Sequence, residues 1–180
     1  MDGGTLLIVD DDADVVHAAL VALRDRTARI VTAGSLDELQ RSLDQQSFDA
    51  VLLDMNFTHG RFDGTEGLSG LARVRLADPS LAVILMTAYA GVSLAVESLK
   101  RGAVDFIMKP WHNARLVESV CAAMAVTCER RAQEHLQLDA IERKAVENAL
   151  ARHHGNISLA AASLGVSRAA LYRRKQKHDL

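Results

Sequence analysis

The chain has 180 residues, of which 49% are hydrophobic and 24% are charged, and its formal net charge is −2. Its apolar runs, such as residues 6–9 and 81–86, are far shorter than the about 20 residues of a transmembrane helix, and its N-terminus lacks the basic start of a signal peptide. We therefore exclude large multidomain machinery and membrane proteins, and we expect a cytoplasmic protein in which Cys121 and Cys128 stay reduced.

Five short apolar runs rich in branched residues alternate with segments of helical periodicity. The predicted strands cover residues 6–10, 28–32, 50–54, 82–87 and 104–108, and the predicted helices cover residues 13–26, 35–46, 66–77, 91–101 and 112–137. Ser35 and Glu38 match a capping box at the start of the second helix. The alternation predicts an α/β domain: a doubly wound, five-stranded parallel sheet with helices on both faces.

After the fifth strand the alternation stops, and the remaining segments are helical. Residues 126–137 are typical of a helical linker, and residues 138–153, 157–164 and 168–178 predict three helices. Residues 1–138 hold 13 basic and 19 acidic side chains, whereas residues 139–180 hold 8 basic and 4 acidic ones. An acidic body with a basic tail indicates two functions, in which the basic tail would bind a polyanion. A solvated basic helix would give the same count of charges.

Polar residues follow the predicted strands at their carboxyl ends, where ligands bind in open parallel sheets. Asp10, Asp11 and Asp54 come together if the first and third strands are neighbours, and three close carboxylates repel one another unless a cation neutralises them. Mg²⁺ suits such a group because it prefers a few carboxylates and keeps several waters. Thr87 and Lys109 end the fourth and fifth strands, and Lys109 adds a counter-charge.

Each of these residues also has a plainer interpretation. The acids after the first strand can cap the following helix, and we favour that role for Asp12 alone. Lys109 and Pro110 fit a simple turn, and Thr87 fits an ordinary strand position because threonine is common in strands. The convergence of acids, a hydroxyl and an ammonium group on one edge favours a site.

Four segments then carry a resemblance to the receiver domain of two-component response regulators. They are LIVDDD at residues 7–12, LDMN at 53–56, MTA at 86–88 and GAVDFIMKP at 102–110. The resemblance covers about residues 4–125 and implies a flavodoxin-like fold, with residues 1–125 as the receiver domain. It further implies that Asp54 is the phosphoacceptor and that Thr87 and Phe106 form a switch pair. A Mg²⁺ site would be made by Asp10, Asp11, Asp54 and the backbone carbonyl of Asn56, and the peptide bond before Pro110 would be cis. Phe106 as a simple core residue stays an alternative.

The segment after Asp54 departs from this pattern, because residues 55–67 are longer than the usual receiver loop and lack its common proline. The sequence DMNF at 54–57 looks more like receivers of sigma-54 activators, yet no phosphate-binding G-x-x-x-x-G-K-[ST] loop is present, so we exclude ATP-driven activation. His59 and Arg61 are candidates to touch a phosphoryl group, although solvated loop residues are the simpler interpretation.

The tail carries a second resemblance. Gly165 fits a left-handed helix end and Ser167 a helix N-cap, which together indicate a helix-turn-helix. GNISLAAASLGVSRAALYRR at residues 155–174 is similar to helix-turn-helix domains of the Fis type, over about residues 138–180. This likeness, with the basic last helix, assigns DNA contacts to Asn156, Ser158, Ser167, Arg168, Tyr172, Arg173, Arg174 and Lys177. It also implies dimerisation through the first helix. Lys175 departs from the family pattern, which has leucine there, so its ammonium either reaches outward or weakens the domain.

These observations predict a non-enzymatic response regulator. A sensor histidine kinase would phosphorylate Asp54, and the phosphorylated chain would dimerise and bind an inverted-repeat DNA operator to control transcription. Two other classes stay open: a Mg²⁺-dependent phosphatase that works through an aspartyl phosphate, and a protein-interaction switch whose tail only dimerises. The phosphatase is disfavoured because its second acid would be replaced by Asn56.

Overall fold

A computed structural model describes residues 3–58, 63–88 and 92–180 and divides the chain into two compact units, Met1–Arg130 and Arg131–Leu180. The strands of the first unit are β1 (Thr5–Val9), β2 (Arg29–Ala33), β3 (Ala50–Asp54), β4 (Val83–Thr87) and β5 (Asp105–Met108). They form one parallel sheet in the order β2-β1-β3-β4-β5, which confirms the predicted fold class.

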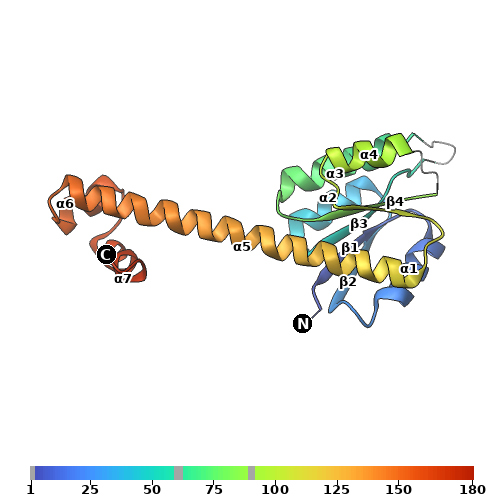
Figure 1. Cartoon of the computed structure of the whole chain (residues 1–180), viewed down its shortest axis with the longest axis horizontal. Helices are drawn as coiled ribbons and strands as arrows, with labels where there is room; N and C mark the ends of the chain where they lie inside the picture. The colour runs from blue at the N-terminus through green and yellow to red at the C-terminus, as the bar shows by residue number, and fades with distance from the viewer. Residues whose placement is uncertain (1–2, 59–62, 89–91) are drawn as a thin grey trace. The chain divides into compact units, whose positions relative to one another are not determined.

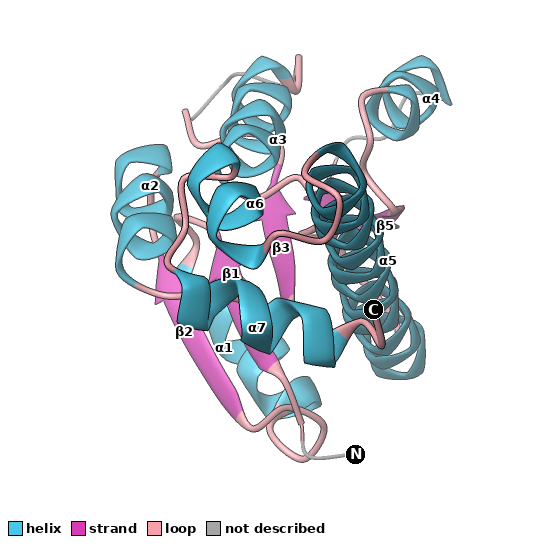
Figure 2. Ribbon diagram, turned by 90° about the vertical axis from the view of Figure 1, so that its left-hand side faces the viewer, coloured by secondary structure: helices cyan, strands magenta, loops and turns pink. Residues whose placement is uncertain are grey.

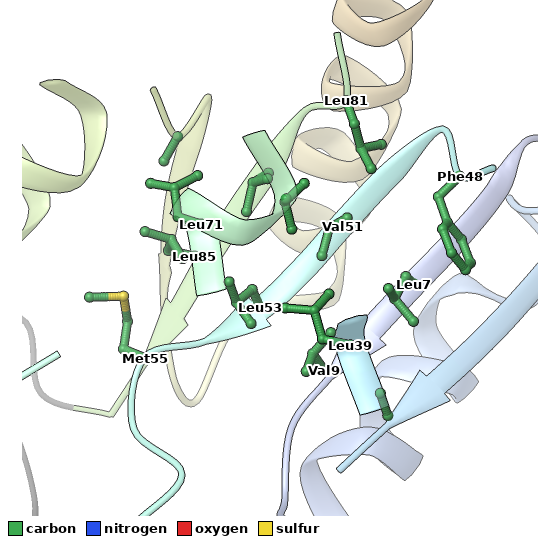
Figure 3. Packing of buried hydrophobic residues seen from close by; sticks show 14 of the residues in the cluster. Leu7, Val9, Leu39, Phe48, Val51, Leu53, Met55, Leu71, Leu81 and Leu85 are labelled. Atoms are coloured by element: carbon green, nitrogen blue, oxygen red, sulfur yellow. The ribbon is translucent and has the colours of Figure 1, made fainter. Parts of the chain in front are cut away.

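Helices cover both faces of this sheet (Figure 1, Figure 2). They are α1 (Ala13–Leu23), α2 (Leu36–Gln45), α3 (Thr65–Ala77), α4 (Val92–Lys100) and α5 (Asn113–Arg152). Because side chains alternate along a strand, each face carries its own core. One core joins α2, α3 and α4 to residues such as Leu53 and Leu85 (Figure 3), and the other joins α1 and the beginning of α5 to residues such as Leu52 and Ile84.

Local sequence signals explain where the helices begin. The Asp12 carboxylate accepts hydrogen bonds from the backbone N–H groups of Asp14 and Val15, so its predicted capping role is confirmed. Ser35 caps α2 as predicted, and the Glu38 side chain returns to the backbone of Gly34. Such caps satisfy N–H groups that have no partner within the helix.

Helix α5 has 40 residues and continues from the first unit into the second without a break. The sequence pattern predicts separate helices at residues 112–137 and 138–153, whereas the structure joins them, because neither glycine nor proline interrupts residues 114–154. Both cysteines lie on α5 as free, exposed thiols. Within the described residues, no helix combines the length and apolarity that crossing a lipid bilayer requires.

The second unit has a small core of its own. Helices α6 (Ile157–Ser163) and α7 (Arg168–Lys177) pack beside the end of α5 (Figure 1), and they bury Val146, Ala149, Ala160, Ala161 and Leu171 together. Gly165 adopts the left-handed conformation, with φ of 67°, in the turn between α6 and α7. Ser167 then caps α7 by accepting a hydrogen bond from the backbone N–H of Ala170, so the predicted helix-turn-helix is present.

Candidate functional site

The carboxyl ends of β1 and β3 meet at one edge of the sheet. The strands are neighbours, and Val9 pairs with Leu53, so the next residues, Asp10 and Asp54, lie side by side. Asp10 is 3% exposed and Asp54 is 4% exposed. Two acids are therefore buried at the place where the topology predicts a ligand site.

Lys109 links these two acids from the end of β5. Its Nζ lies 2.6 Å from Asp10 Oδ2 and 2.6 Å from Asp54 Oδ1, and we call these three residues the lysine centre. Burial raises the pKa of Asp10 above that of an ordinary aspartate, although the hydrogen bond from Lys109 acts to lower it. Burial opposes the charge of Lys109 as well, but its hydrogen bonds to Asp10 and Asp54 outweigh this and raise its pKa.

Asp11 adds a third, exposed carboxylate, and one oxygen atom from each of Asp10, Asp11 and Asp54 lies within 4.8 Å of the other two. Three carboxylates face one ammonium group, so the group has an excess of negative charge. Hard oxygen ligands at this spacing suit a divalent cation such as Mg²⁺ or Ca²⁺. The acids predicted from the strand ends are thus brought together in a group that can hold a metal ion.

Thr87 and Phe106 lie on adjacent strands of the same sheet. Thr87 is fully buried and shares the face of Val83 and Leu85, and Phe106, which pairs with Leu85, is partly buried against the same core. The backbone oxygen of Thr87 accepts a hydrogen bond from the N–H of Lys109. The peptide bond between Lys109 and Pro110 is cis, as the resemblance implied.

The loop after Asp54 is held by contacts that sequence reasoning missed. The Glu66 carboxylate accepts hydrogen bonds from the N–H groups of Phe57 and Thr58, at 2.8 and 3.0 Å, and from the Thr58 hydroxyl. The Asn56 side chain accepts one from the N–H of Gly64, and the Asn56 N–H donates to Asp54 Oδ2 at 2.8 Å. Glu66 followed a glycine-rich stretch and matched no motif, so the sequence carried no signal for it.

Close packing fixes the far end of the same loop. A Cβ on Gly67 would lie 2.5 Å from Met55 Cα, so only glycine allows the start of α3 to approach the chain that follows Asp54. The other two loop candidates, His59 and Arg61, lie outside the described residues.

The predicted DNA contacts of the second unit fall into two groups. The first group consists of exposed side chains that are not part of an ion pair within this unit: Asn156, Ser158, Ser167, Arg168, Tyr172 and Arg173. Within this group, Asn156 caps α6 and Ser167 caps α7, so both already serve helix ends.

Arg174 and Lys177 form the other group, because both are ion-paired with α5. Arg174 Nε donates to Glu142 Oε1 at 2.8 Å, and Lys177 Nζ lies 2.6 Å from Asp139 Oδ1. Lys175, which departs from the Fis-type pattern, is half-buried on the same helix. The sequence thus identified the cations of α7 but not their acidic partners.

Two family models match the chain. The response regulator receiver domain matches residues 6–121, and the bacterial regulatory protein Fis family matches residues 137–178. The short stretch between the two matches has no room for an ATPase domain. The matched residues include the lysine centre in the first case and α7 in the second.

Individual proteins give the same likeness. The alginate biosynthesis transcriptional regulatory protein AlgB of Pseudomonas aeruginosa is 33% identical over 107 residues, which are 59% of this chain and 23% of AlgB. The chain thus spans about a quarter of the length of the curated relatives it matches. A solved receiver domain from Bacteroides fragilis is 38% identical with a TM-score of 0.61, and the match covers 69% of this chain and 98% of that one.

A second solved structure resembles both units. It is a response regulator from Burkholderia pseudomallei, described with a phosphorylated aspartic acid, a calcium ion and citrate. It is 25% identical with a TM-score of 0.56, and the match covers 95% of this chain and 97% of that one.

Proposed function

We propose a function for this chain from its family, because it belongs to the response regulators and has a receiver domain and a Fis-type helix-turn-helix domain. We infer that a sensor histidine kinase phosphorylates Asp54 and that the signal changes DNA binding by the tail, in the cytoplasm. For the domain boundaries we propose residues 1–125, a linker at 126–137 and a DNA-binding domain at 138–180.

The lysine centre is the observation that carries this proposal. Phosphoryl transfer depends more on positioning and on neutralising charge than on covalent help from the protein. An Asp54 oxygen would attack the phosphorus of a phosphohistidine, the P–N bond would break, and the imidazole would leave with a proton. Lys109 already lies against Asp54 Oδ1 and would balance the charge that the phosphoryl group brings.

We propose that Asp10, Asp11, Asp54 and the backbone carbonyl of Asn56 bind Mg²⁺. When bound, this ion supplies positive charge and a fixed position for phosphoryl oxygens. The hydrogen bond from the Asn56 N–H to Asp54 Oδ2 holds this part of the loop beside the acids. The calcium ion and phosphorylated aspartic acid of the Burkholderia pseudomallei regulator support the assignment.

The switch would start at Thr87 and Phe106. A phosphoryl group on Asp54 offers new acceptors for the Thr87 hydroxyl, and movement of Thr87 vacates space into which the Phe106 ring can turn. A local change in charge would then alter the surface of the domain. The position of both residues beside the same core, on neighbouring strands, supports this proposal.

The output would be sequence-specific binding of a homodimer to an inverted repeat. Leu138 and Ile141 are each 66% exposed on α5 and lie three residues apart, so they share one helix face. Apolar side chains this exposed favour a protein contact. Two copies of α7 related by a two-fold axis would then enter successive major grooves, roughly 34 Å apart.

Phosphorylation is tested with acetyl phosphate on the full chain. We expect Mg²⁺-dependent labelling of the wild type and none of Asp54→Asn, measured by intact-protein mass spectrometry. Labelling without a divalent cation, or on the Asp54→Asn variant, would contradict the proposal. Asp44→Asn, an exposed acid on α2, is the matched control and should label normally.

DNA binding is tested by selecting duplexes from a random pool and measuring affinity for the enriched site and for a scrambled one. Arg168 begins α7 and is exposed, so we expect Arg168→Ala to lose about 1–3 kcal/mol on the enriched site and much less on the scrambled site. Equal losses on both would mean that Arg168 contacts phosphates rather than bases.

A further inference from the structure

The basic end of α7 is surrounded by acids of its own chain. Lys177 Nζ lies 2.6 Å from Asp139 Oδ1 and 3.1 Å from Glu142 Oε2, Arg174 Nε lies 2.8 Å from Glu142 Oε1, and His178 Nε2 lies 3.0 Å from Glu142 Oε2. We call these five residues the charge cluster. Asp139 and Glu142 are three residues apart on α5, so one helix face presents both acids to α7.

The acids of the charge cluster are charged at any physiological pH. Hydrogen bonds from His178, Lys177 and Arg174 lower the pKa of Glu142 to about 2, and the hydrogen bond from Lys177 lowers the pKa of Asp139. The Lys177 side chain is nevertheless 49% exposed and that of Arg174 is 37% exposed. These cations are therefore paired at the surface, where another anion can reach them.

Two other cations of α7 are different. Arg168 and Arg173 are exposed, and within residues 131–180, all of which the structure describes, neither of them is part of an ion pair. A carboxylate offers a cation the same kind of partner as a DNA phosphate does, a charged oxygen that accepts hydrogen bonds. Helix α7 thus presents two exposed cations without an ion pair, Arg168 and Arg173, and two ion-paired cations, Arg174 and Lys177.

We propose that Asp139 and Glu142 are specificity-determining residues that compete with DNA phosphates for the cations at the end of α7. The inference rests on the proposed DNA-binding function. Phosphate contacts strengthen binding to every sequence, whereas contacts with base edges distinguish one sequence from another. Holding Lys177 and Arg174 in ion pairs lowers the affinity for arbitrary DNA and leaves the start of the helix free to recognise bases.

Removing one charge from the cluster tests the competition. Glu142→Gln keeps the shape of the side chain and one acceptor oxygen but releases Arg174 and weakens the hold on Lys177. On a scrambled duplex of about 30 base pairs, roughly three helical turns, we expect the full-length variant to bind about three- to tenfold more tightly at low salt. Affinity for the enriched site should rise less, so the ratio of the affinity for the enriched site to that for the scrambled duplex should fall.

The salt dependence of binding gives an independent readout. About one additional phosphate contact makes the slope of log K against log salt steeper by about 0.9, so the variant should lose about three- to fourfold more affinity between 50 and 200 mM salt. Asp139→Asn should also raise the affinity for scrambled DNA and steepen the salt slope, but by less than Glu142→Gln does, because Asp139 pairs with Lys177 and not with Arg174. A merely structural role for these acids would not steepen the slope.

Glu147→Gln is the matched control. Glu147 lies on the same helix and pairs with Arg143 at 2.9 Å, so this variant makes the same change in net charge without touching α7. Equal binding by Glu142→Gln and Glu147→Gln would overturn the inference. Weaker binding of scrambled DNA by both cluster variants, with lower helicity in circular dichroism, would also overturn it.

The experiment distinguishes failure of the competition from failure of the proposed DNA-binding function. A wild-type chain that binds no duplex overturns the proposed DNA-binding function itself. A wild-type chain that selects a site, while Glu142→Gln behaves as its control does, overturns only the competition.

Discussion

In the receiver, one ammonium group lies between two buried carboxylates, whereas in the tail two partly exposed carboxylates lie among three basic side chains. The Lys109 side chain is 14% exposed and those of its partners Asp10 and Asp54 are 1% and 6% exposed. The side chains of Asp139 and Glu142 are 33% and 30% exposed. Both regions use ion pairs, but the first leaves an excess of acid, which suits a metal cation, whereas in the second Arg174 and Lys177 balance two carboxylates at the surface, where a polyanion can compete for them.

The difference in burial decides what these pairs contribute to stability. Breaking a buried pair by removing one partner leaves an uncompensated charge and typically destabilises a protein by about 3–5 kcal/mol. An exposed pair contributes only about 0.2–1 kcal/mol, because water and salt screen it. The lysine centre is therefore tied to the stability of the fold, while the charge cluster can open without unfolding it.

The largest expected effect follows from removing the ammonium group of the lysine centre. In Lys109→Ala the carboxylates of Asp10 and Asp54 face each other without a counter-charge, so we expect a loss of about 3 kcal/mol in the free energy of unfolding without metal. Mg²⁺ should recover part of this loss, because a cation that binds only the folded state stabilises it.

Chemical unfolding with and without Mg²⁺ measures this prediction. Lys100→Ala, which removes an exposed lysine at the end of α4, is the control and should change stability by less than about 0.5 kcal/mol. Equal stability of the two variants would mean that solvent reaches the acids more freely than their exposure indicates.

The second effect concerns the core of the tail. Leu171 is fully buried in a small cluster on α7, so Leu171→Ala should destabilise the second unit by about 2–3 kcal/mol, the lower part of the usual range, since a small core can relax around the cavity. Hydrogen exchange should accelerate in α6 and α7 and stay unchanged in the sheet. Faster exchange throughout the chain would show that the two units unfold as one.

The lysine centre was predictable from the sequence and the charge cluster was not. Asp10, Asp54 and Lys109 end strands, and a parallel sheet brings all strand ends to one edge whatever the details of packing. Glu142 meets Arg174 only because α7 packs beside α5, and no local pattern connects residues 32 positions apart. Glu66 was missed for a similar reason, since its role depends on the path of the loop between Asp54 and α3.

The third effect is expected at that loop. Glu66→Gln leaves one acceptor oxygen for the N–H donors of Phe57 and Thr58, but it removes the negative charge and the oxygen that accepts from the Thr58 hydroxyl, so we expect about 1 kcal/mol less stability. Mg²⁺ binding, measured by calorimetry, should weaken by about threefold because the carbonyl of Asn56 loses its support. Glu97→Gln on α4, which removes an exposed ion pair with Arg101 just after this helix, should leave Mg²⁺ binding unchanged.

The smallest effect is a dependence on pH that separates the two regions. The pKa of Glu142 falls from 4.5 to about 2 on folding, so its contribution to stability is complete above pH 4.5 and is lost as the pH falls through about 2. Asp139, whose pKa is also lowered, adds to the loss in the same direction. The protection factors of the α7 amides, which are corrected for the intrinsic exchange rate, should therefore fall over this range in the wild type and fall less in Glu142→Gln, with Glu147→Gln behaving as the wild type. The lysine centre has the opposite sign at its acid, because burial raises the pKa of Asp10 and acid relieves the repulsion there. An equal acid response of α7 in Glu142→Gln and the wild type would mean that Glu142 is not the acid-sensitive group.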